Sequence, residues 1–272
     1  MNQFFSFKRF TLLVLKHWAD NKKRYGLSVL AFIGLLITWF VFTLLVEPDI
    51  RMPKDVQQIT YFFSLFVVGT FYASQYFSDL GSRSKGINFL LVPASAFEKL
   101  LCSLLYTVVL FFVVFTTIFY IVDSLMVAIS SNLPGNNEVN GKPTVVNVFK
   151  IIILRFNRDS TINFLLLYFS VQSVFLLGSV FFEKYSFIKT IISGFIAGFI
   201  LFCLMYFFNE LMPDGEYPHG FLTAYRISVE GGDDHLVQVP RWIGEVFRFL
   251  VMYAVAPFFW IVTYYRLKEK QV

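Results

Sequence analysis

Apolar runs long enough to cross a bilayer constrain the fold of this chain more than any other feature. A bilayer core of about 30 Å needs around 20 mostly apolar residues in a helix. By that measure the sequence contains about six predicted spans, at residues 26–46, 59–77, 100–121, 162–182, 187–208 and 246–265. Only residues 183–186 separate the fourth span from the fifth, which predicts a tight helical hairpin. We therefore expect an all-α polytopic membrane protein.

The composition excludes an ordinary soluble globular protein. Apolar residues make up 57% of the chain and charged residues 15%, against roughly 45–50% and about 25% in soluble domains. The formal net charge is +5, but the basic residues are dispersed and cluster only beside the apolar runs. Such clusters are a signal of membrane topology. We therefore expect the lipid bilayer, and no nucleic acid, as a partner.

The lysine and arginine residues predict the orientation, because cytoplasmic loops carry an excess of them. With the N-terminus inside, the predicted inner segments hold more basic residues than the outer segments, although the outer segments are longer. The inner residues are Lys8, Arg9, Lys16, Lys22, Lys23, Arg24, Arg83, Lys85, Lys99, Lys184, Lys189, Arg266, Lys268 and Lys270. Both termini are therefore predicted to be cytoplasmic.

The first 24 residues are predicted to form an amphipathic helix on the inner membrane surface. Its apolar face carries Phe7, Phe10, Val14 and Trp18, and its opposite face carries Arg9, Lys16, Asp20 and Lys23. This helix is either a plain interfacial anchor or a dedicated partner contact, and the pattern favours neither. We expect a connecting helix at 1–24 and a six-helix transmembrane domain at 25–272, with outer loops at 130–161 and 209–245.

No sequence motif points to catalysis in this chain. The sequence has no P-loop, no zinc-ligand spacing and no nucleophile elbow. Asp233, Asp234 and His235 are adjacent in the second outer loop, where a solvated acidic loop explains them better than a metal site. We expect no catalytic residue, no cofactor and no metal ion.

Ionisable residues inside spans usually mark ion or proton pathways, and they are nearly absent here. Asp123 stands at the outer end of the third apolar run, from where we expect it to reach the interface. This pattern counts against secondary active transport. Uncharged polar residues within spans form hydrogen bonds between helices or line a weakly polar pathway. The candidate pathway residues are Ser64, Thr70, Tyr72, Gln75 and Gln172.

The predicted inner connection between the second and third spans, LGSRSKGINFLLVPASAFEKLLCS at 80–103, mixes apolar and polar residues. Gly81 and Gly86 are able to break the end of the second helix. Pro93 is suited to open a new helix. Ser95 is a plausible N-cap, and Glu98 three residues later completes a capping box. We expect a helix break, a short apolar element around 87–92, and then the third span.

This connection resembles the corresponding region of ABC-2-type exporter permeases. In that family an apolar "LL-x-P-x-S" element follows the second span, and a Lys or Arg opens the third. The residues that fit the pattern are Leu90, Leu91, Pro93, Ser95, Glu98 and Lys99. The predicted layout agrees with the family, except that the outer loop after the third span is long for a minimal permease.

The resemblance implies a multi-pass permease subunit in a bacterial cytoplasmic (inner) membrane. A separate ABC ATPase subunit would dock on the segment at 81–99 and would carry out the ATP hydrolysis. The implied coupling residues are Ile87, Phe89, Leu90, Leu91, Pro93, Ser95, Glu98 and Lys99. A second permease chain, identical or different, would complete the pathway through the second and fifth spans.

The alternative function is a non-transport polytopic scaffold subunit of a bacterial envelope complex. Binding of an ATPase at the inner face distinguishes the two hypotheses. Nothing in the spans distinguishes a lipid, polysaccharide, peptide or drug substrate.

Overall fold

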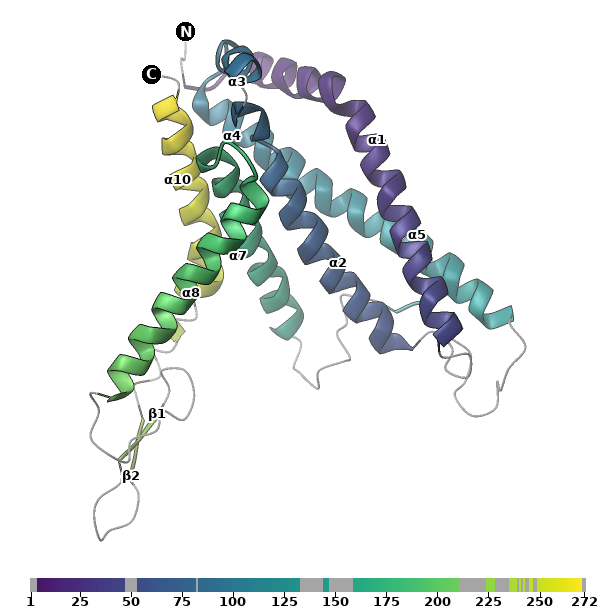
Figure 1. Ribbon diagram of the computed structural model, residues 1–272, viewed down its shortest axis with the longest axis vertical. Helices are drawn as coiled ribbons and strands as arrows, with labels where there is room; N and C mark the ends of the chain where they lie inside the picture. Colours follow the sequence, from purple (N-terminus) through teal and green to yellow (C-terminus); the bar gives the residue numbers. More distant parts are fainter. Residues whose placement is uncertain are drawn as a thin grey trace.

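The computed structural model describes residues 4–46, 53–81, 83–132, 144–146, 159–210, 224–227, 235–238, 240, 242, 245–246 and 249–270. Most of these residues belong to long helices that run between two ends of the molecule (Figure 1). The first and last described residues lie at the same end as the short helix α3 (Arg83–Leu90), and we name this the terminal end.

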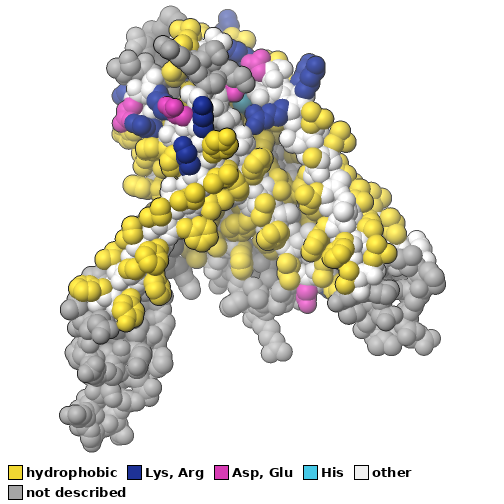
Figure 2. All heavy atoms as spheres, in the orientation of Figure 1, with side chains coloured by type: hydrophobic (Ala, Val, Ile, Leu, Met, Phe, Trp, Pro, Cys, Tyr) yellow, Lys and Arg dark blue, Asp and Glu magenta, His cyan; other side chains and the backbone are white. Residues whose placement is uncertain are grey.

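Five helices of the described residues are long and apolar enough to cross a membrane, which is compatible with a multi-pass membrane protein. They are α1 (Phe7–Val46), α2 (Lys54–Gln75), the continuous helix Ala96–Asn132, the apolar part of α7 (Asp159–Phe181), and the apolar part of α8 (Ser186–Glu210). Charged side chains gather at the terminal end, and the flanks of the helices are apolar (Figure 2).

Two helices contain π-helical turns. The helix Ala96–Asn132 consists of α4 (Ala96–Leu104), a π-helical turn η2 (Leu105–Leu110) and α5 (Phe111–Asn132). The predicted sixth span falls on a second such turn, η3 (Leu250–Ala254), followed by α10 (Val255–Lys270). Pro257 has no backbone N–H to donate to the preceding turn, which explains why the regular helical hydrogen bonding changes just before it.

The connecting helix and the first predicted span are one continuous helix. α1 has 40 residues, so at 1.5 Å per residue it is about 60 Å long, twice the thickness of a bilayer core. Figure 1 shows that α1 bends: its first part crosses the terminal end, and its second part descends beside α5. The first part precedes the apolar run at 26–46 and lies outside that span. No proline or helix cap separates the two parts, so the predicted boundary at 24–25 is no break in the helix.

Helix packing creates two main apolar clusters. The larger joins Phe32, Leu36 and Phe40 of α1 to Tyr61 of α2 and Phe119 of α5. The second lies nearer the terminal end and joins α2, α4, α7 and α10 through Ala73, Leu100, Leu176, Val180 and Leu267. These clusters hold the bundle together, whereas most of α8 is exposed along its length.

The described residues are helical almost throughout, as predicted, with one short exception. A short antiparallel hairpin pairs β1 (Ala224–Ile227) with β2 (His235–Gln238), with Ala224 opposite Gln238 and Ile227 opposite His235. It lies within the predicted outer loop at 209–245, at the end opposite the terminal end (Figure 1). A hydrogen-bonded hairpin satisfies backbone groups that a structureless loop would leave to water.

Candidate functional site

The segment that links α2 to α4 turns back on itself at the terminal end. A 3₁₀ turn, η1 (Ser78–Gly81), leads into α3 (Arg83–Leu90), and α4 begins at Ala96. The predicted apolar element at 87–92 is therefore the second half of α3 plus the start of a turn. Gly86 is buried inside α3, where an added Cβ atom would lie 3.2 Å from the Leu80 carbonyl oxygen. It therefore does not break a helix, contrary to the prediction.

The predicted cap at the start of α4 is confirmed. The backbone N–H of Glu98 donates to Ser95 Oγ over 3.1 Å, and Glu98 Oε2 accepts from the backbone N–H of Ser95 over 2.9 Å. This reciprocal pair satisfies two donors that a helix start would otherwise leave unpaired. The cap sets the direction in which α4 enters the bundle.

Glu98 also binds the N-terminal segment, which the sequence did not predict. Its Oε1 atom accepts from the backbone N–H of Ser6 at 2.7 Å and from Arg9 Nη2 at 3.0 Å. Ser95 Oγ donates to the Phe4 carbonyl at 2.7 Å, and the rings of Phe4 and Phe97 stack with centroids 4.8 Å apart. Glu98 is fully buried, so its charge is matched by donors from two distant parts of the chain.

Lys99 connects α4 to the end of α3. Its ammonium group donates to the Leu90 carbonyl over 3.2 Å and lies 5.2 Å from the centre of the Phe89 ring. A cation at the last carbonyls of a helix is favourable because those groups carry partial negative charge. Lys99 is 1% exposed, and its side chain therefore holds α3 at a fixed position against α4.

Several predicted coupling residues remain accessible next to the buried contacts of Glu98 and Lys99. Ile87 is 51% and Leu91 74% exposed, and Pro93 is exposed as well. Phe89 and Leu90 are half-buried beneath them. These exposed apolar side chains, at an end where charged groups gather, form the candidate interaction surface of the segment.

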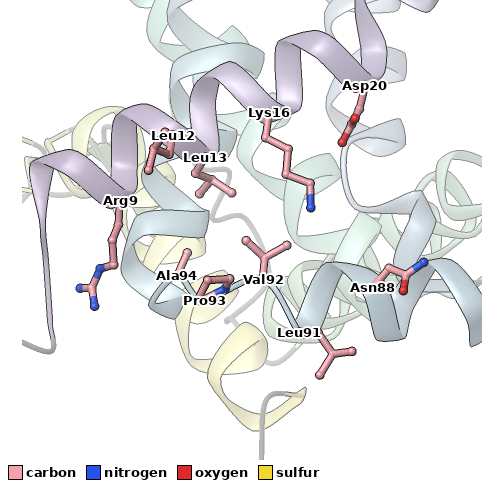
Figure 3. A pocket seen from close by; sticks show the side chains of 10 residues that line it. All are labelled: Arg9, Leu12, Leu13, Lys16, Asp20, Asn88, Leu91, Val92, Pro93 and Ala94. Atoms are coloured by element: carbon pink, nitrogen blue, oxygen red, sulfur yellow. The ribbon is translucent and has the colours of Figure 1, made fainter.

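A groove of about 630 Å³ separates this turn from α1 (Figure 3). Leu12, Leu13 and Lys16 point into it from α1, and Leu91 and Pro93 belong to the facing turn. The first part of α1 and the turn therefore present one continuous surface. This arrangement gives the amphipathic helix a neighbour within the chain, through Leu13 and Val14, as well as an outward side.

Gly81 packs this segment directly against the turn between α7 and α8. A Cβ atom at position 81 would overlap the carbonyl oxygen of Glu183, so only glycine fits there. The predicted tight hairpin is confirmed: α7 ends at Phe181 and α8 begins at Ser186. Tyr185 adopts a φ of 55°, a left-handed conformation that closes the turn.

An aromatic group surrounds His17 in the first part of α1. The ring stacks on Tyr76 with centroids 4.8 Å apart, lies 4.5 Å from Tyr106, and shares a hydrogen bond with the Tyr25 hydroxyl. Burial lowers the pKa of His17 from 6.5 to about 4, and Asp20 and Asp79 oppose this shift only in part. His17 is therefore a packing residue that fixes α1 against the residue after α2 and against the π-helical turn η2.

The candidate pathway residues do not share one surface. Ser64 and Thr70 are buried and donate to backbone carbonyls of their own helix, at Thr60 and Phe66. Tyr72 and Gln75 line a cavity of about 640 Å³ between α1 and α2. In that cavity Arg24 donates to the Gln75 side chain over 3.3 Å.

Gln172 has a different role. It is 1% exposed, and its side-chain amide donates to the Thr107 carbonyl within the π-helical turn η2. In that turn the N–H of Phe111 bonds to the carbonyls of Tyr106 and Val108. A regular helix would instead pair Phe111 with Thr107, so Gln172 supplies the donor that the π-helical turn withdraws.

Asp123 is buried, contrary to the expectation that it reaches the interface. It is 1% exposed, and neither carboxylate oxygen has a hydrogen-bond partner among the described residues. The helix continues past it to Asn132, and its neighbours Phe119, Val122 and Met126 belong to the larger apolar cluster. The predicted third span ends at 121, whereas the helix continues to Asn132 and buries Asp123 beside the larger apolar cluster.

Among the described residues, no group of three or more His, Cys, Asp or Glu side chains is placed to hold a metal ion. Asp233 and Asp234 lie outside the described residues, and His235 is described only as part of β2. No family model, curated protein or solved structure matches this chain.

Proposed function

We propose that this chain is the transmembrane permease subunit of an ABC-2-type exporter in a bacterial inner membrane. It forms the substrate pathway, and a separate ATP-binding subunit docks on the segment at 81–99. The observation that supports this proposal best is the construction of that segment. Its exposed side chains, Ile87 and Leu91, stand on a base held by the buried residues Glu98 and Lys99.

Such a base transmits force to several helices at once. Glu98 binds the start of α1, and Lys99 binds the end of α3. Gly81 abuts the turn that joins α7 to α8. A push on Leu91 would therefore reach α1, α4, α7 and α8 together, as a subunit that converts ATP-driven movement into helix rearrangement requires.

The proposed topology has six spans and both termini in the cytoplasm. An even number of crossings is supported by the first and last described helices, because α1 begins and α10 ends at the terminal end (Figure 1). Five helices have the length and apolar character of spans. The sixth crossing is assigned to η3 and α10, which together run from Leu250 to Lys270 and extend about 31 Å at 1.5 Å per residue.

A second permease chain is proposed to cover α8 and the neighbouring part of α2. Phe195, Phe199 and Phe202 of α8 are 76%, 67% and 66% exposed. Near the start of α8, Phe71 of α2 is half exposed and packs edge-to-face on Phe187. The resemblance to exporter permeases assigns the partner chain to these two helices.

The proposal is tested by purifying the chain from its native membrane in mild detergent and identifying its partners by mass spectrometry. We expect a stoichiometric P-loop ATPase. The Leu91→Glu and Ile87→Glu variants should lose it, because a charge would be buried in the docking surface. The matched control is Tyr185→Asp, which changes an equally exposed residue, 76% against 74%, at the same end but outside the segment.

Two outcomes would count against the proposal. Retention of the ATPase with full coupling in the Leu91→Glu variant would remove the docking role of this segment. Envelope proteins without any ATPase would favour the scaffold function instead.

A further inference from the structure

A second cavity, separate from the docking segment, lies between α1, α2 and α5. Its volume is about 390 Å³, within the roughly 300–1,000 Å³ range of small-molecule sites. α1 lines it from Trp18 to Phe32, and the helix Ala96–Asn132 lines it from Leu110 to Ile118. The cavity thus extends along α1 for about 20 Å, at 1.5 Å per residue.

The lining of this cavity is polar at one end only. Lys22 is the single charged residue among those that line it, and Trp18 lies one turn away. The remaining length is bordered by apolar side chains, including Phe32, Val68 and Ile118. A cation and an indole followed by an apolar slot match the order of groups in a membrane lipid, where a phosphate precedes the acyl chains.

The hydroxyl groups along the cavity do not alter this pattern. The Tyr25 hydroxyl is hydrogen-bonded to His17 and to the Tyr72 hydroxyl, and Ser28 Oγ donates to the Arg24 carbonyl over 2.9 Å. These groups therefore do not offer a second polar site along the slot. Lys22 has two basic neighbours in sequence, Lys23 and Arg24, so the polar end carries a local positive charge.

We propose that this cavity holds an acyl chain of an anionic phospholipid from the surrounding bilayer, with the phosphate at Lys22. All three walls belong to helices that are long and apolar enough to cross a membrane, so the slot opens among lipid chains. The lipid fills the space between α1 and the rest of the bundle where α1 bends. This site goes beyond the proposed transport function and does not depend on an ATPase.

Two glycines of α1 allow a matched test. A Cβ atom at Gly26 or at Gly34 would meet no other atom within 4 Å, so both positions accept a side chain. Only Gly26 lines the cavity. Gly26→Leu should fill the slot and Gly34→Leu should leave it open, with the same change in helix propensity.

The measurement is native mass spectrometry of the purified full-length chain, titrated with phosphatidylglycerol or with phosphatidylcholine of the same chain length. We expect one phosphatidylglycerol to bind about tenfold more tightly than phosphatidylcholine. Gly26→Leu should abolish both the bound lipid and the preference for phosphatidylglycerol over phosphatidylcholine. Gly34→Leu should keep both. Lys22→Gln should reduce the preference, while Lys23→Gln, outside the cavity lining, should retain most of it.

A phosphatidylglycerol with a photoreactive group in its acyl chain locates the bound lipid directly. Crosslinks should map to α1 and α5 around Phe32 and Phe115. Equal affinity for the two lipids, or equal effects of the Gly26 and Gly34 substitutions, would overturn the proposal. Crosslinks spread evenly over the exposed face of α8 would overturn it as well.

Discussion

Two regions of this molecule treat buried acidic side chains in opposite ways. At the start of α4, Glu98 is fully buried and accepts hydrogen bonds from Ser6, Arg9 and Ser95. In α5, Asp123 is 1% exposed and has no hydrogen-bond partner among the described residues. Buried polar groups in proteins are nearly always paired. Glu98 follows this rule, and Asp123 departs from it among the described residues.

The two regions should respond differently when their acidic side chain is substituted. The contacts around Glu98 all come from the chain itself, and removing its carboxylate would leave the Ser6 and Ser95 N–H groups without this acceptor. The surroundings of Asp123 gain nothing from its carboxylate, because an unpaired charge among apolar side chains is costly. Substitutions at the two acids should therefore shift stability in opposite directions.

The largest effect is expected for Glu98→Ala. It removes the Glu98 side-chain half of the capping box and one partner of Arg9, and it leaves the Ser6 and Ser95 N–H groups without their acceptor. We expect a loss of about 2–4 kcal/mol in the free energy of unfolding, measured by denaturant titration in detergent. Glu269→Ala serves as the control, because its pair with Arg266 is exposed and should be worth less than about 1 kcal/mol.

Gly81→Ala should give the next largest loss. The added methyl group would overlap the Glu183 carbonyl and force the docking segment away from the turn between α7 and α8. Overpacking of this kind costs about 1–3 kcal/mol. Gly194→Ala, where a Cβ meets nothing within 4 Å, should instead be stabilising by up to about 1 kcal/mol. Equal thermal midpoints for the two variants would contradict this expectation.

Asp123→Leu tests the other side of the comparison. Because the carboxylate has no partner among the described residues, we expect the variant to be neutral or more stable by about 1–3 kcal/mol. The same denaturant titration measures it. A destabilised Asp123→Leu variant would mean that the carboxylate is paired in the assembled protein and would remove the contrast with Glu98.

At neutral pH the smallest effect is expected for His17, whose contribution changes only on acidification. Its pKa is lowered by burial from 6.5 to about 4, so the unfolded chain binds a proton more readily than the folded chain between these values. Stability should therefore fall as the pH decreases from 6.5 to about 4. His17→Phe should flatten this part of the pH profile, and an unchanged slope would assign the effect to other groups.

The local features of this chain follow from short stretches of sequence. Apolar runs predict the helices, because about 20 such residues match the bilayer core. The order Ser-x-x-Glu at 95–98 predicts the capping box, because at this spacing each side chain reaches the backbone N–H of the other residue. The brief gap at 183–186 likewise predicts the hairpin between α7 and α8.

The tertiary structure decided which distant groups meet. Nothing near Glu98 in sequence indicates that its second oxygen binds Ser6 and Arg9, about 90 residues earlier. The burial of Asp123 and the contact between Gly81 and Glu183 depend equally on how the helices pack. Hydropathy and capping act within a few residues, whereas the partner of a buried polar group is set by the arrangement of whole helices.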